Sequence, residues 1–193
     1  MQILKRIPAA VMPVTKLRTV ISCSLSAAIS YGIFVGADGL DIAGIPDTIV
    51  ILTPGLVFAL ALLGSIRRPL SLIWRIVIAV VIIAGWYAAY QSAIAIEASL
   101  YIAGGVAGAV GGAALFVVLL SHPQRRTASN AALLVAAGGA IGAICLPAGF
   151  LFGKPEDFHY LFLTFLPWQV GMGLLVGDDW DRWIGTRGWA VTP

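Results

Sequence analysis

Charged residues are scarce in this chain. Among its 193 residues, Asp, Glu, Lys and Arg together make up 11%. Soluble domains carry about 25% charged residues, so the charged fraction of this chain is less than half of the usual fraction. Hydrophobic residues make up 60%, and the mean hydropathy is +0.96. Because so few charges cannot cover so much apolar surface in water, the composition excludes a soluble domain and makes a lipid bilayer the expected partner.

Cysteine and histidine are equally sparse, with two of each. If the apolar runs described below cross a membrane in alternation, His122 and His159 lie on opposite sides and cannot share a metal or a catalytic site. Cys23 and Cys145 fall at different depths, so no disulfide is expected between them. We therefore expect no metal, no cofactor and no catalytic activity.

Long apolar runs are the feature that the sequence has in abundance. They cover about Thr19–Gly36, Ile45–Gly64, Ser71–Ile94, Ser99–Leu120, Ala131–Phe152 and Phe158–Val176. Each is close to the roughly 20 residues that a helix needs to cross a bilayer. A chain inside lipid must satisfy its own backbone hydrogen bonds, which requires helices here. The short loops predict an all-α, polytopic membrane protein, with six transmembrane helices in one antiparallel bundle over residues 1–193.

The distribution of basic residues predicts the orientation of this bundle. With six spans, Lys154 is the single basic residue, of twelve, that falls on the side opposite to the others. Basic loops stay in the cytoplasm, so both termini, residues 1–18 and 177–193, are expected there. The pI near 9.1 then reflects topology and not nucleic-acid binding. We expect a bacterial cytoplasmic (inner) membrane.

Glycines recur at four-residue spacing in the later spans. The stretch "GGVAGAVGGAAL" lacks both the G-x-G-x-x-G spacing and the lysine of nucleotide loops. Four-residue spacing puts the glycines on one helix face, where a second backbone can approach closely. The predicted helix-packing glycines are Gly104, Gly108, Gly112, Gly138, Gly142, Gly173 and Gly177. We expect spans four, five and six to form a tight core, with a helix of another subunit as the competing partner.

Polar groups within the spans are few, and no acid or lysine lies at the middle of a span. Buried polar groups are costly in lipid, so those that remain are functional candidates. Proline interruptions in corresponding spans also point to a binding site. The candidate polar pathway consists of Thr53, Pro54, Tyr90, Gln91, Pro147 and Gln169. It would run between spans two, three, five and six, although Gln169 could simply bridge two helices.

The last segment combines tryptophans with charges. Its candidate docking residues are Trp180, Trp183, Arg187 and Trp189. Tryptophan favours the headgroup level of a membrane, so this tail could lie on the inner surface. Because Trp and Arg also anchor protein interfaces, it could instead bind a partner.

Three functions remain open. The first is a permease- or channel-like module for a small solute. The second is an accessory or assembly subunit, as a homo-oligomer or with other membrane subunits. The third is a lipid-processing enzyme around Glu156, Asp157 and His159. A continuous polar cavity inside the bundle would favour transport, whereas a dry core packed through glycines, with small residues on an apolar outer face, would favour the subunit.

Overall fold

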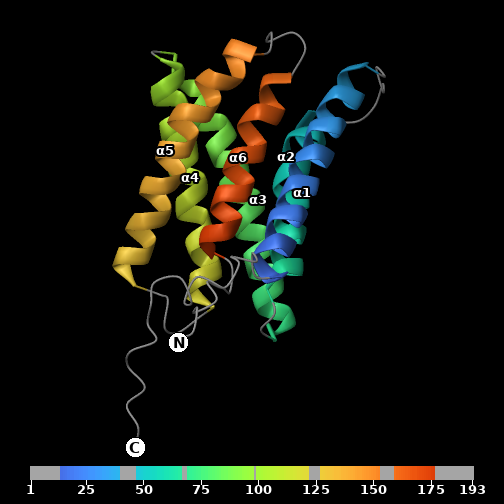
Figure 1. Cartoon of the computed structure of the whole chain (residues 1–193), viewed down its shortest axis with the longest axis vertical. Helices are drawn as coiled ribbons and strands as arrows, with labels where there is room; N and C mark the ends of the chain where they lie inside the picture. The colour runs from blue at the N-terminus through green and yellow to red at the C-terminus, as the bar shows by residue number, and fades with distance from the viewer. Residues whose placement is uncertain are drawn as a thin grey trace, which may run out of the picture.

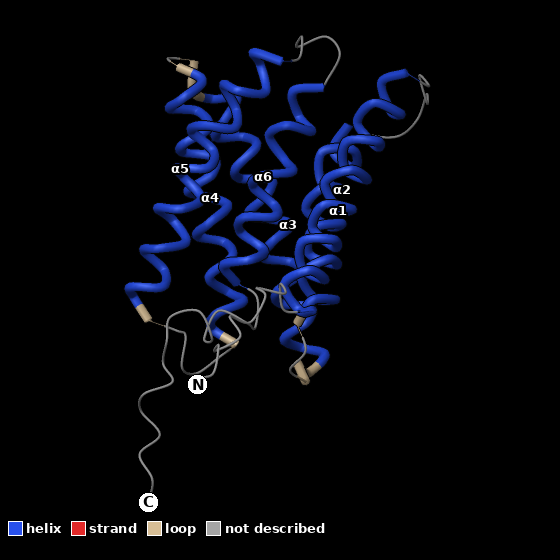
Figure 2. The backbone as a smooth tube through the Cα atoms, in the orientation of Figure 1, coloured by secondary structure: helices blue, strands red, loops and turns tan. Residues whose placement is uncertain are grey.

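Every regular element in the part of the chain that the computed structural model describes is an α-helix. The described residues are 14–39, 47–66, 69–97, 99–121, 127–152 and 159–176. They form helices α1 (Val14–Gly39), α2 (Asp47–Ser65), α3 (Leu72–Ala95), α4 (Leu100–Leu120), α5 (Ala128–Phe152) and α6 (His159–Val176). Figure 2 shows these helices as the coiled parts of the backbone tube. The predicted all-α fold is confirmed, with one helix for each apolar run.

Among the described residues, three helices are long and apolar enough to cross a membrane. The qualifying segments are Leu72–Ala95, Leu100–Leu120 and Ala128–Leu151, which belong to α3, α4 and α5. Shorter apolar segments occupy α1, α2 and α6. The length and composition of the three longer helices indicate an integral membrane protein.

The six helices are arranged as a closed ring. Each helix packs against the next in the sequence, and α6 returns to pack against α1 (Figure 1). The contact between α4 and α5 is the most extensive, and α4 also touches α6. We call the end of the bundle that carries the connection between α3 and α4 the α3–α4 end, and the opposite one the α2–α3 end. The α3–α4 end is uppermost in Figure 1.

Local side-chain bonds fix the starts of two of these helices. The Ser71 hydroxyl accepts a hydrogen bond from the backbone N–H of Trp74 at 3.3 Å, and Ser99 does the same for Tyr101 at 3.3 Å. Such serine N-caps satisfy backbone donors that the first helical turn leaves free. The serines that precede the apolar runs thus set where α3 and α4 begin.

Apolar side chains fill the half of the ring nearest the α2–α3 end. Leu62 near the end of α2, Ile78 near the start of α3, Leu119 at the end of α4 and Leu134 near the start of α5 are all fully buried. They belong to one cluster with Val176, the last residue of α6. This half of the bundle is therefore closed by a packed apolar core.

Large apolar side chains also cover the outside of the ring. On α3, Leu72, Ile73, Ile76 and Val80 are all more than half exposed. Apolar exposure along successive turns of one helix is unfavourable in water but suits contact with lipid. The outer surface thus agrees with the membrane assignment that the three long helices give.

Candidate functional site

Glycines join α4 to α5 with almost no side chain between the two backbones. A Cβ atom added to Gly104 would clash with the carbonyl oxygen of Gly142, and one added to Gly108 would clash with that of Gly138. Gly112 faces the carbonyl oxygen of Leu134 in the same way. We call these five glycines and Leu134 the glycine seam. The four-residue spacing that predicts close packing thus has its partner within the same chain.

The two predicted glycines of the sixth span do not belong to this seam. Gly173 faces α1, where the Cys23 sulfur is the closest atom to an added Cβ. Gly177 lies outside the described residues. Because the ring places α6 between α5 and α1, the glycines of α6 pack against more than one helix. The expected core of spans four, five and six is present in the contacts that α4, α5 and α6 make with one another, but Gly173 packs against α1 and not into this core.

A cavity of about 250 Å³ lies inside the ring. Its wall follows α3 from Ile82 to Ile94, includes Ile96 just after that helix, and follows α4 from Leu100 to Leu115. Leu146 of α5 contributes a further part of the wall, as do residues of α2 and α6. At a rise of 1.5 Å per residue, the lining stretch of α4 is about 20 Å long. The cavity is thus elongated along the helices.

Aromatic side chains surround the inner part of the cavity. The rings of Phe58 and Trp168 meet edge to face at 5.6 Å, and those of Trp86 and Phe165 at 4.9 Å. All four line the cavity. The Trp168 ring lies against Gly111, where an added Cβ would be 2.6 Å from its Cζ2 atom. Gly111 therefore makes room for the ring that bounds the cavity at the middle of the bundle.

The cavity reaches the surface at the α3–α4 end. Ile94 and Leu100 both line it, and they are 58% and 41% exposed. At its inner limit, Ile82 and Leu115 line the cavity and also belong to the packed core of the other half. The cavity is thus open towards one end of the bundle and blocked towards the other.

The chemistry of the lining is apolar. Tyr90 and Thr164 are the lining side chains with a hydroxyl, and the Thr164 hydroxyl donates to the Cys145 carbonyl at 3.4 Å. The Trp86 indole N–H donates to the Ile51 carbonyl at 2.7 Å. A bound water needs two to four polar partners, which this lining does not supply in one place. The cavity therefore suits an apolar occupant.

Because the cavity opens to the surface, it can exchange its contents with the surroundings. An apolar molecule inside it would bury apolar surface, at about 25 cal/mol per Å².

Of the candidate polar pathway, only Tyr90 lines the cavity. The Thr53 hydroxyl donates at 2.6 Å to the Ile49 carbonyl of its own helix. Pro54 and Pro147 are buried within α2 and α5. The structure therefore does not bring these residues together around one path.

The two glutamines of the predicted pathway are also apart from the cavity. Gln91 is exposed. Gln169 is fully buried at 0% exposure, and neither atom of its amide has a hydrogen-bond partner. The Ser26 hydroxyl of α1 is likewise buried without a partner. Gln169 thus does not form the expected bridge between two helices, and its amide is left in an apolar interior.

The remaining predicted sites fall on the undescribed parts of the chain. These are Glu156, Asp157 and the tail residues Trp180, Trp183, Arg187 and Trp189, together with the side chain of His159. Within the residues that the structure does describe, no three His, Cys, Asp or Glu side chains gather as a metal site would require.

The sequence prediction missed the aromatic side chains and Gly111. A usable signal was the pair Gly111-Gly112, since adjacent residues of a helix point to different sides. Gly112 faces α5, whereas Gly111 faces Trp168 of α6. A double glycine in a membrane helix can thus mark two close contacts and not one.

No family model, curated protein or solved structure matches this chain. Its function is therefore inferred from the cavity and from the distribution of charge.

Proposed function

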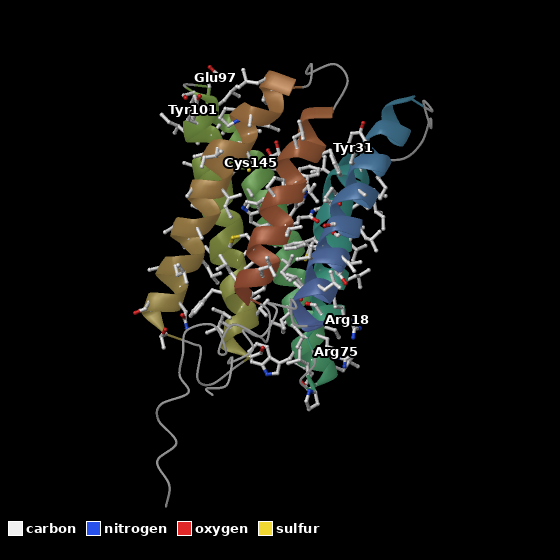
Figure 3. All side chains as sticks on the ribbon, viewed as in Figure 1. Arg18, Tyr31, Arg75, Glu97, Tyr101 and Cys145 are labelled. Atoms are coloured by element: carbon white, nitrogen blue, oxygen red, sulfur yellow. The ribbon has the colours of Figure 1, made fainter. Side chains whose placement is uncertain are left out.

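We propose that this protein is a permease-like module that crosses a bacterial-type inner membrane six times and acts without catalysis. The charged residues support an orientation with the α2–α3 end in the cytoplasm, since Arg18 and Arg75 lie at that end and Glu97 lies at the α3–α4 end (Figure 3). Because basic residues stay on the cytoplasmic side, the α2–α3 end, where α1 begins and α6 ends, faces the cytoplasm in this proposal. The α3–α4 end then faces outward.

The single observation that carries the proposal is the cavity of about 250 Å³. Its lining is apolar and is not the continuous polar path that would favour a hydrophilic solute, so the solute that we propose is an apolar one. It begins at the outward end of the bundle and stops at the packed core of the cytoplasmic half. Transporters that work by alternating access hold their substrate site near the bilayer midplane and open it to one side at a time. A cavity that is open outward and closed inward matches one of the two states that such a cycle needs.

Three prolines within helices support the second state of the cycle, in which the cavity would be open to the cytoplasm. Pro54, Pro147 and Pro167 each interrupt a helix of the ring. A proline in a helix removes one backbone hydrogen bond and permits a kink. Rearrangement at these positions would let the cytoplasmic half open while the outward half closes.

Flux into proteoliposomes tests this function. The purified chain is reconstituted and offered a panel of ionic, polar and apolar solutes. Ala107 lines the cavity on α4, whereas Ala113 is exposed on the same helix and does not line it. We expect Ala107→Leu to reduce flux to the level of protein-free liposomes and Ala113→Leu to keep the wild-type rate. Absence of flux for every solute class would overturn the proposal.

The accessory-subunit alternative makes a different prediction. It requires a stable complex after gentle purification, which native mass analysis would detect. The glycine seam does not favour this alternative, because its close contacts are made between α4 and α5 of one chain. The permease proposal requires flux from this chain without other subunits.

A further inference from the structure

We propose that the cavity binds the hydrocarbon chain of a single-chain lipid, such as a lysophospholipid. The inference names the substrate class of the same cavity and therefore rests on the proposed permease function. The lipid chain would lie parallel to the helices, with its methyl end at the middle of the bundle. Its polar head would lie at the outward end.

The shape of the cavity supports a linear occupant. The residues of α4 that line the cavity span about 20 Å, so the cavity is elongated. An elongated apolar space suits an extended hydrocarbon chain better than a compact ring system or a sugar.

The walls have the surface that an alkyl chain requires. Small residues on the two longest walls, Ala89 and Ala93 of α3 with Ala103, Ala107 and Gly111 of α4, line the cavity. Small side chains leave a smooth channel in which methylene groups can make close dispersion contacts. The absence of a polar cluster in this lining disfavours sugars, amino acids and ions, which would lose their hydration without replacement.

The two ends of the cavity differ as the two ends of such a lipid differ. The inner end is bounded by the rings of Phe58 and Trp168, whose carbon atoms are suited to a terminal methyl group, although the Trp168 indole N–H is buried without a hydrogen-bond partner. Glu97 and Tyr101 do not line the cavity, but both are exposed at the outward end of the bundle (Figure 3), close in sequence to the exposed lining residue Leu100. Tyrosine favours the headgroup level of a bilayer. A polar head at this end would remain in the hydrated headgroup region while its chain is buried.

Quenching by bromine tests the assignment directly, because Trp86 and Trp168 line the cavity. The probe is a lysophospholipid with bromine on the terminal carbon of its chain, titrated into the purified protein in a detergent without bromine. We expect saturable quenching of tryptophan fluorescence. Ala107→Leu should weaken the apparent affinity at least about tenfold through steric overlap, and Ala113→Leu should leave it unchanged.

Further variants distinguish quenching by probe bound in the cavity from quenching by probe elsewhere in the micelle. Trp168→Phe should reduce the saturable part of the quenching, whereas quenching of the exposed Trp74 by probe in the micelle would not saturate at a defined site. Ala93→Leu fills the same cavity from α3 and replaces Ala107→Leu if that variant does not fold. Thermal unfolding of each variant shows whether it is folded.

The outcomes distinguish this inference from the proposed function. Equal quenching in wild type and in both cavity-filling variants would overturn the inference. A brominated two-chain phospholipid that quenches and competes equally well would overturn the single-chain assignment. If a polar solute shows flux that Ala107→Leu abolishes, while the lysophospholipid does not bind, the substrate class is wrong but the permease stands. Saturable chain binding without any flux supports the inference and overturns the permease.

Discussion

A single methyl group at the centre of the glycine seam should loosen the α4–α5 pair. In Gly108→Ala, the new Cβ would lie 2.8 Å from the carbonyl carbon of Gly138 and 3.1 Å from the Cα atom of Gly142. Ordinary van der Waals contact begins at 3.4 Å. The contact with the Gly138 carbonyl carbon alone requires the backbones to separate by 0.6 Å, and the Gly138 carbonyl oxygen, which is the nearest atom, requires more. All three partners are backbone atoms that cannot rotate away.

The size of the destabilisation in Gly108→Ala follows from the dispersion contacts that the separated helices lose. A gap of 0.5–1 Å forfeits about a quarter to a half of each contact, and each contact contributes roughly 0.1–0.2 kcal/mol. Over several tens of contacts along the seam, the loss is about 2 kcal/mol, within the roughly 1–3 kcal/mol typical of overpacked cores. Alanine recovers up to about 1 kcal/mol through its higher helix propensity. The net destabilisation of about 1–2 kcal/mol corresponds to a fall in Tm of about 2–8 °C for a chain of this length.

The buried thiol of Cys23 supplies the assay. Cys23 is fully buried, so a maleimide dye reacts with it only as the bundle opens. The measurement uses a Cys145→Ala background, because Cys145 is partly accessible. Gly64→Ala is the matched control, since an added Cβ there would have nothing within 4 Å. If Gly108→Ala and Gly64→Ala unfold at the same temperature, the packing role of the seam is refuted.

Three further predictions concern the interior of the ring. Replacing the buried, unpartnered amide in Gln169→Met, at similar volume, should stabilise the protein by about 1–3 kcal/mol; a fall in Tm would show that the amide has a partner. Trp86→Phe loses the hydrogen bond to the Ile51 carbonyl and should cost about 0.5–1.5 kcal/mol in thermal unfolding; an unchanged Tm would contradict the bond. Gly111→Ala should push the Trp168 ring towards the cavity and so change the fluorescence emission of Trp168, which is measured as the difference between spectra recorded without and with Trp168→Phe. An unchanged emission of Trp168 would disprove this contact.

Much of the fold follows from local patterns in the sequence. Apolar runs of about 20 residues permit only helices in lipid, so each run could be assigned before any contact was known. The contacts of the glycine seam can also be predicted from the sequence, because the spacing of Gly104, Gly108 and Gly112 places them on one face of α4. What this spacing could not decide was whether the facing helix belongs to the same chain.

The cavity could not be predicted in the same way. Its existence depends on the combined sizes of side chains from five helices, and on the closure of the ring by α6 against α1. The polarity of a residue in a span also does not show which way it points. The sequence places Gln91 and Gln169 among the candidates for one polar path, but Gln91 is exposed and Gln169 is enclosed in the interior. Apolar residues such as Trp168 instead bound the cavity.

Transbilayer movement of a lysophospholipid in proteoliposomes tests the central claim most directly. A fluorescent lysophospholipid is added to one leaflet, and its appearance in the other is followed by extraction with albumin. We expect the wild type and Ala113→Leu to accelerate this movement, and Ala107→Leu, which fills the cavity, to return it to the rate of protein-free vesicles. Equal acceleration by all three proteins, or none by the wild type, would contradict the assignment of the cavity as the substrate site of a permease.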